Sequence, residues 1–165
     1  MYTSVDEVCV AIDKLMLQNL ELIEQKVVVT VQLEGLLRDG HIKLAKARYI
    51  QGKENIGVLQ IPTEDVQMNS LFELETFIKD DKKEDEAIHF DICRKETGPN
   101  KKEPQDPIKW FGVLVPQNLR DAQKQFQSAL YLAVQSANIS AKMITIPEKL
   151  DHLKNIKNNF LKEEE

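Results

Sequence analysis

Aromatic side chains are scarce in this sequence, at 6% of 165 residues, whereas charged residues make up 30% and hydrophobic residues 42%. High charge with few aromatic residues is typical of long helices rather than of a compact β-sandwich. The length fits one domain of ordinary size, with enough apolar material for a core. We therefore expect a mainly helical single domain over residues 1–165.

Cysteine is nearly absent, because Cys9 and Cys93 are the only two. Two cysteines are too few for the disulfide framework of a small secreted fold. The first seven residues lack the basic and apolar regions of a signal peptide, and no apolar run approaches the ~20 residues that span a bilayer. We expect a cytosolic or nuclear protein without direct membrane insertion, whose membrane contacts come through a partner.

Catalytic and ligand-binding motifs are also missing. The sequence has no Gly-rich phosphate loop, no nucleophile elbow and no His/Cys set at metal-ligand spacing. His41, His89 and His152 are scattered, and the carboxylates fall in runs that are typical of solvated faces. The net charge of -5 argues against nucleic acid. We expect no enzymatic activity, no catalytic residue, no cofactor and no metal.

The first segment predicts a long helix over residues 4–50. Ser4 and Glu7 have capping-box spacing at its start. Apolar residues then recur at helical spacing on a stripe of about three positions per heptad; they include Val5, Val8, Ile12, Leu15, Leu22, Val29, Leu33 and Leu36. The run Val27–Val31 favours a strand in isolation, but its flanks keep the helical period, so we expect packing to override propensity.

Asparagine and glycine residues depart from the apolar, helix-favouring pattern of this segment. Asn19 lies on the apolar stripe, where it either fixes register and partner choice or marks a frayed, solvent-facing turn. Gly35 and Gly40 each cost ~1 kcal/mol relative to alanine inside a helix. They indicate a bend or a close approach of another helix.

The middle, residues 51–107, reads as an insertion and linker. Gly52 and Gly57 end the helix, and Val58–Pro62 is expected to be a short extended segment. Alternating apolar residues predict a β-hairpin of residues 71–78 and 87–93, with the charged stretch 80–86 as a solvated tip. Residues 97–107 have the composition of a flexible linker.

The last segment, residues 108–165, predicts a second long helix after Pro116. Alanines dominate its apolar stripe and permit close approach of another helix, while Pro147 is expected to interrupt or kink it. The two helical segments are nearly equal in length. The predicted fold is therefore mainly α, an antiparallel coiled-coil hairpin with a small β-hairpin or extended central insertion.

Two motifs resemble a known family. The first is Leu44-Ala45-Lys46-Ala47-Arg48-Tyr49 followed by Gly57-Val58-Leu59-Gln60. The second is Gln105-Asp106-Pro107-Ile108-Lys109-Trp110-Phe111-Gly112-Val113-Leu114-Val115-Pro116, which leads into Leu119-Arg120, Ala122-Gln123 and Phe126. Together they resemble the signature of the peripheral coiled-coil assembly factors of the vacuolar proton ATPase. The length and the helix–linker–helix layout agree with that family.

The resemblance implies a function that composition does not show. Members of this family pair with a small membrane-embedded partner on the endoplasmic reticulum and help the proton-translocating membrane sector assemble, which supports lysosomal or vacuolar acidification. The implied partners are that small protein and membrane-sector subunits of the ATPase. The implied location is the cytosolic face of the endoplasmic reticulum, with the ER–Golgi intermediate compartment, transport vesicles and endolysosomes as further sites.

The matched motifs supply the candidate site, as partner-interface or hairpin-core residues. These are Leu44, Lys46, Arg48, Tyr49, Trp110, Phe111, Gly112, Leu114, Pro116, Leu119, Arg120 and Phe126. Trp110 and Phe111 either plug the open end of the hairpin or anchor a partner, since buried Trp often dominates interfaces. Two other functions stay open: a self-associating tether or vesicle adaptor, and an enzyme with an unrecognised site in the central segment.

Overall fold

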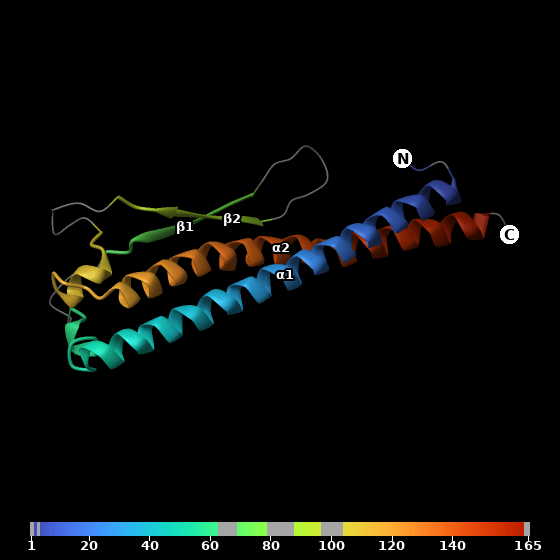
Figure 1. Ribbon diagram of the computed structural model, residues 1–165. Coiled ribbons are helices and arrows are strands. Elements are labelled where there is room, and N and C mark those ends of the chain that lie inside the picture. The colour runs from blue at the N-terminus through green and yellow to red at the C-terminus, as the bar shows by residue number, and fades with distance from the viewer. Residues whose placement is uncertain (1, 3, 63–68, 79–87, 97–103, 164–165) are drawn as a thin grey trace. The chain divides into compact units, whose positions relative to one another are not determined.

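The computed structural model describes residues 2, 4–62, 69–78, 88–96 and 104–163. Its elements are, in chain order, α1 (Val5–Gln51), η1 (Val58–Gln60), β1 (Phe72–Ile78), β2 (Ile88–Arg94), η2 (Pro107–Phe111) and α2 (Gln117–Glu163) (Figure 1). The protein is therefore mainly helical, as predicted, with two long helices and a two-stranded antiparallel sheet.

The chain divides into two compact units, and each long helix contributes a segment to both. Unit 1 comprises residues 1–30, 77–89 and 135–165, and unit 2 comprises residues 31–76 and 90–134. Each unit thus contains one segment of α1 and one of α2. The division into helix 1, insertion and helix 2 made from the sequence stays a prediction.

Helix α1 begins and ends where local chemistry predicts. Ser4 Oγ accepts a hydrogen bond from the Glu7 amide at 3.3 Å, which satisfies one of the free amides of the first turn. The valine run 27–31 is helical, so packing does override its strand propensity. The helix stops before Gly52, whose φ of 84° is a conformation that glycine adopts at little cost.

Helix α2 begins after Pro116, whose carbonyl accepts from the Leu119 amide at 3.0 Å. Of the two outcomes expected at Pro147, the interruption is wrong, because α2 continues through this residue to Glu163; a kink stays a prediction. A proline removes one backbone hydrogen bond, here the one to the Met143 carbonyl. The neighbouring Ile146 is buried, so packing on this turn helps the helix continue.

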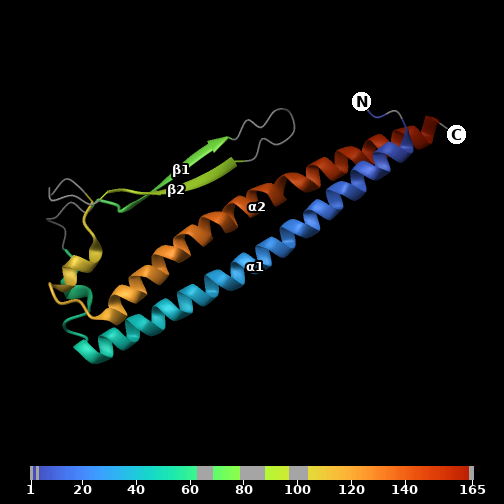
Figure 2. The same ribbon diagram turned by 45° about the horizontal axis from the view of Figure 1, so that its top comes forward.

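Unit 1 has an aliphatic core between its two helix segments, which lie side by side in Figures 1 and 2. Its buried residues are spaced in multiples of seven: Val8, Leu22 and Val29 on α1, and Ile139, Ile146 and Leu153 on α2. Lys26 adds a polar contact, since its Nζ donates to the hydroxyls of Ser136 and Ser140, both at 2.6 Å, and to the Ser136 carbonyl at 3.0 Å.

Unit 2 is built around small residues. Ala122 and Ala129 of α2 are buried, as is Gly40 of α1. A Cβ on Gly40 would lie 3.0 Å from Phe126 Cε1, whereas one on Gly35 would meet only Arg38 Nη2 at 4.0 Å. Gly40 therefore marks a close helix approach, and Gly35 does not.

The two helix segments of unit 2 run in opposite directions. Lys43 Nζ lies 3.6 Å from Asp121 Oδ2, and the ring of His41 contacts that of Phe126 at 5.1 Å. Contacts thus move forward along α2 as they move back along α1.

The strands β1 and β2 fall close to the predicted ranges. The Lys95 amide donates to the Leu71 carbonyl at 2.9 Å, and the rings of Phe77 and His89 lie 5.0 Å apart. Both contacts fit one register, which places Glu73 opposite Cys93. In unit 2, Phe72 also packs edge-on against Tyr131 of α2 at 6.1 Å. The predicted tip, residues 80–86, lies outside the described residues.

Two expectations for the middle need correction. Val58–Gln60 is a 3-10 turn, not an extended segment, because the Gln60 side chain folds back to accept from the Gly57 amide at 2.8 Å. Only Ile61, which precedes Pro62, is extended. The predicted linker includes Pro107, but this residue begins η2 with Asp106 as its N-cap; residues 97–103 lie outside the described part.

Candidate partner-binding site

The candidate residues from the matched motifs meet in unit 2, where an inner cluster joins four segments. Ala47 of α1, Ile56 of the following turn and Leu119 of α2 are buried together. Leu44, Phe111 and Val115 pack against them. The end of α1, η2 and the start of α2 are thereby held to one another.

Asp106 positions η2 from the side of α2. Its carboxylate accepts from the Ile108 amide at 3.1 Å and also from the Gln123 side chain of α2. The first bond caps η2 and the second ties it to the helix. Phe111 is the last residue of η2, so this link helps direct its ring into the inner cluster.

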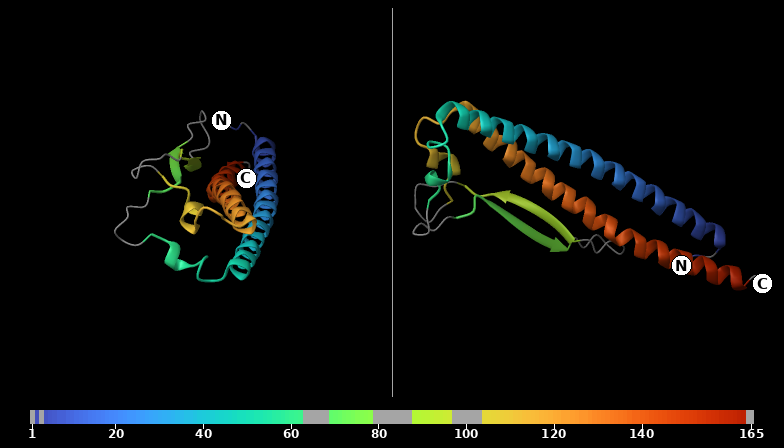
Figure 3. Two further views of the ribbon diagram at one scale, coloured as in Figure 1. Left: turned by 60° about the vertical axis from the view of Figure 1, so that its left-hand side comes forward. Right: turned by 90° about the horizontal axis from the view of Figure 1, so that it is seen from below.

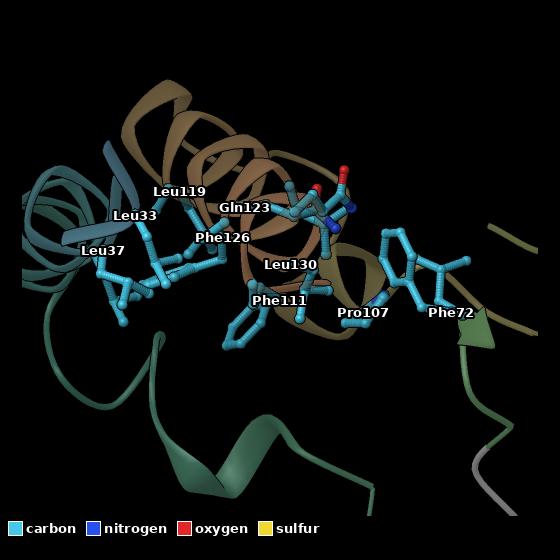
Figure 4. A pocket seen from close by; sticks show the side chains of 16 residues that line it. Leu33, Leu37, Phe72, Pro107, Phe111, Leu119, Gln123, Phe126 and Leu130 are labelled. Carbon is cyan, nitrogen blue, oxygen red and sulfur yellow. The ribbon is translucent and has the colours of Figure 1, made fainter. Parts of the chain in front are cut away.

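An open apolar cavity of about 590 Å³ lies beside this cluster (Figure 4). Leu33 and Leu37 of α1, Phe126 and Leu130 of α2, and Phe72 of β1 surround it. Among the lining side chains that the structure describes, Gln123 and Gln127 are polar and the others are apolar. Such a cavity can accept an apolar group, but it offers no side chain for proton transfer.

Several large apolar residues of the same motifs face solvent. The exposed fractions are 91% for Tyr49, 81% for Val58, 88% for Leu59, 94% for Val113 and 89% for Leu114. We call these five the loop end. They come from the last turn of α1, from η1 and from the segment after η2, and Figure 3 shows these elements close together in unit 2.

The loop end is accompanied by basic side chains. Among the described residues of its segments, the exposed basic side chains are Lys46, Arg48, Lys53, Lys109 and Arg120, and the exposed carboxylate is that of Glu54. Lys46 and Tyr49 also line a shallow depression with Ile42, Ala45 and Ile50. A protruding apolar surface with a basic rim has the composition of a binding surface rather than of a core.

The structure thus separates the predicted site residues into two groups. Leu44, Phe111, Leu119 and Phe126 lie in the cluster or line the cavity, and Pro116 is half-buried at the start of α2. The exposed group comprises Lys46, Arg48, Tyr49, Gly112, Leu114 and Arg120. Trp110 is half-buried in η2. Whether it acts as a plug or as an anchor stays a prediction.

Sequence reasoning missed residues that belong to this site. Val58, Leu59 and Val113 lie in the matched motifs, but apolar residues read as core in a sequence. Asp106 carried a usable signal, because an Asp before a Pro is a frequent N-cap arrangement. Ile56 follows the four loop residues 52–55, and nothing in the local pattern marks it as buried.

Within the described residues, no helix is long and apolar enough to cross a membrane. The same part of the chain holds no group of three or more His, Cys, Asp or Glu side chains that could bind a metal ion. The features of unit 2 that favour binding are therefore apolar and basic surfaces together with one apolar cavity.

Fold and site together describe a mainly helical protein with two long helices and large exposed apolar residues in the segments between them. The chain belongs to the Vma22/CCDC115 family, whose profile matches residues 13–129. It is 33% identical to the vacuolar ATPase assembly protein VMA22 of Mus musculus over 145 residues, which cover 78% of this chain and 79% of the relative. The Homo sapiens protein of that name is 31% identical, with 78% and 81% covered. The Danio rerio protein is 27% identical over 177 residues, with 82% and 83% covered. These matches confirm the family resemblance found in the motifs.

Proposed function

We propose that the protein assists assembly of the vacuolar proton ATPase, and in particular of its proton-translocating membrane sector, and so supports lysosomal or vacuolar acidification. Family membership and the names of the relatives support the assembly role. The observation that carries the proposal is the loop end, where five large apolar residues of the matched motifs are more than four-fifths exposed.

The loop end is proposed to hold partner subunits by burying these side chains. Full burial of a large aliphatic side chain is worth about 1.5–3 kcal/mol, and association itself cancels much of such a sum. Binding through a few such residues is therefore strong enough to hold an incomplete complex and weak enough to be reversed. Reversibility suits a factor that leaves before the pump works.

The long helices are proposed to form an antiparallel coiled-coil hairpin. The opposed contacts of unit 2 and the seven-residue spacing of the buried aliphatics in unit 1 support this packing. A hairpin would present the turn between its helices, where the loop end lies, as the part that meets a partner.

The proposed partners are a small membrane-embedded protein of the endoplasmic reticulum and membrane-sector subunits of the ATPase. The proposed location is the cytosolic face of that membrane, with later passage to the ER–Golgi intermediate compartment, vesicles and endolysosomes.

Affinity purification from detergent-solubilised membranes tests this proposal. Tagged wild-type protein should recover membrane-sector subunits and a small membrane protein without the complete cytosolic sector. Val113→Ser with Leu114→Ser should lose this recovery and raise lysosomal pH in cells that depend on the variant. Ile144→Ser, which changes a side chain of α2 that is 72% exposed, is the matched control and should keep both. Recovery of only cytoskeletal or coat proteins would favour the adaptor function instead.

A further inference from the structure

Helix α1 carries a second heptad seam on the side opposite its packed one. The packed seam of unit 1 has alternating spacings of four and three, and its buried or half-buried residues are Val8, Ile12, Leu15, Asn19, Leu22, Lys26 and Val29. Residues two positions away lie about 200° around a helix. The second row keeps the same alternating spacing there, and we call it the outer seam: Asp6, Val10, Asp13, Leu17, Leu20, Glu24 and Val27.

The outer seam is solvent-exposed along its length. Its four apolar residues, Val10, Leu17, Leu20 and Val27, are 57–68% exposed, and its three carboxylates are exposed as well. It spans about 32 Å at ~1.5 Å per residue. Four of its seven positions are apolar and three are carboxylates, so the row is a mixed apolar and acidic stripe at the spacing at which one helix packs against another.

The carboxylates of the outer seam indicate which side chains a partner helix must carry. Asp6, Asp13 and Glu24 occupy seam positions, where a partner helix must face them. The same seam of a second copy of this chain contains no basic residue that could pair with these carboxylates, and an anionic membrane surface would repel them. A partner with Lys or Arg at the facing positions of an apolar stripe would pair all three.

The packed seam of the same helix shows how such a polar position is satisfied. Lys26 lies on that seam, and its ammonium is met by two serine hydroxyls and one carbonyl of α2. Because Lys26 is engaged there, Lys14 is the remaining basic residue of α1 between residues 5 and 30. The outer seam therefore presents net negative charge.

We propose that the outer seam docks a basic amphipathic helix on the cytosolic side of a membrane protein. The inference rests on the proposed function, which supplies the membrane partner; segments flanking membrane spans on the cytosolic side are rich in Lys and Arg. The acidic seam is thus a contact separate from the basic loop end of unit 2, and each surface selects a partner of different charge.

A pair of labelled synthetic helices tests the proposal by fluorescence anisotropy with the full chain. Both have about 22 residues with Leu at seam positions; one carries Lys opposite Asp13 and Glu24, and the other carries Glu there. Wild-type protein should bind the Lys helix at least about tenfold more tightly than the Glu helix, a difference that shrinks as salt is added. Asp13→Lys with Glu24→Lys should reverse the preference.

Matched variants distinguish binding at the outer seam from non-specific hydrophobic binding. Leu17→Ser with Leu20→Ser should weaken binding of the Lys helix about tenfold or more, whereas Ile144→Ser and Glu148→Lys, at exposed positions of α2, should not. Circular dichroism should show every variant folded. Equal binding of both helices, equal loss in the controls, or self-association that the seam variant abolishes would overturn the proposal. So would seam-dependent binding to anionic vesicles.

The assay contains no ATPase subunit, so its failure is distinct from failure of the proposed function. A negative result would overturn the docking seam while recovery of membrane-sector subunits could still support the assembly role. If the Lys helix binds but membrane-sector subunits are not recovered, the docking seam would be supported and the assembly role would not.

Discussion

Units 1 and 2 use the same two helices but pack them differently. In unit 1 the buried residues of both helices are aliphatic and spaced by sevens, with Lys26 bound to two serines. In unit 2 the helices meet at Gly40, Ala122 and Ala129, and larger side chains such as Phe111 come in from elements outside the helices. In unit 1 the aliphatic side chains fill the interface between the two helices. In unit 2 the small residues leave space beside the helices, and the other elements fill this space only in part.

This difference in packing explains where the candidate binding surfaces of each unit lie. Unit 2 has the apolar cavity and the loop end because its helix surfaces are incomplete without η1, η2 and the strands. In unit 1 the packed seam of α1 is already covered by α2, so the surface that we propose for binding is the outer seam of α1. Variants that disturb one kind of packing should therefore leave the other kind of surface intact.

The largest expected effect is loss of the inner cluster of unit 2. Leu119→Ala should lower the free energy of unfolding by about 2–5 kcal/mol, because Leu119 is buried against Ala47 and Ile56. Leu114→Ala, at a residue 89% exposed, should change it by less than about 0.5 kcal/mol. Urea denaturation measures both. A large loss for Leu114→Ala would mean that the loop end is core and not interface.

The close approach at Gly40 sharpens the comparison. Gly40→Ala should destabilise unit 2 by about 1–3 kcal/mol, since the new methyl group would press on the Phe126 ring. Gly35→Ala is the matched control and should stabilise by about 0.5–1 kcal/mol, because its methyl group meets open space in a helix. Thermal unfolding of both variants measures these changes, and a stabilising effect of Gly40→Ala would contradict the close contact with Phe126.

Trp110→Ala distinguishes the two roles weighed for the tryptophan. A half-buried plug should lower the melting temperature by a few degrees, about 2–4 °C for each kcal/mol lost, and recovery of the partner should fall with it. An anchor should leave the melting temperature unchanged while recovery falls. We expect the first result, and a variant unchanged in both respects would contradict either role.

Lys26 offers a smaller effect in unit 1. Lys26→Met keeps the length of the side chain but removes three hydrogen bonds to α2. A typical net value is ~1 kcal/mol per bond, partly offset here because the ammonium no longer has to be desolvated. We expect a loss of about 1 kcal/mol by urea denaturation. Lys14→Met, at an exposed position, should have no effect, and an equal loss there would point to surface charge instead.

The smallest effect concerns the sheet rather than the helix seams. The pKa of the Cys93 thiol is raised by desolvation and by the negative charges of Glu75, Asp91 and Glu73. A raised thiol pKa leaves less thiolate at a given pH. In a Cys9→Ser background, alkylation at pH 8 should be slower than for a short unstructured cysteine peptide. Glu75→Gln should speed it, and a rate that does not respond to Glu75 would contradict the electrostatic cause.

The sequence predicted the helices well because their periodicity is long and their ends carry local signals. Ser4 and Gly52 marked the limits of α1, and Pro116 marked the start of α2. Short elements were harder. The Gly57 amide donates a hydrogen bond to the side-chain oxygen of Gln60 and favours a turn over an extended segment at Val58–Gln60, and that bond depends on the folded positions of the neighbouring residues.

The candidate site was predictable as a set of residues and not as an arrangement. The motifs named Phe111, Leu119, Tyr49 and Leu114 alike, since apolar residues look the same in a sequence whether they are buried or exposed. Phe111 and the exposed pair Val113 and Leu114 are separated by Gly112, whose φ of 94° turns the chain after η2. No pattern of spacing encodes that turn.

Pro147 has a consequence for how unit 1 opens. Because it has no amide proton, the Met143 carbonyl loses its helical partner, and the hydrogen-bonded ladder of α2 is interrupted there although the helix continues. Among the described residues beyond it, Leu153 is buried, whereas Leu150, Ile156 and Phe160 are half-buried. Local opening of residues 148–163 should therefore cost less free energy than opening of the helix before the proline. Amide hydrogen exchange would then reveal a faster-exchanging terminal segment within an otherwise continuous helix.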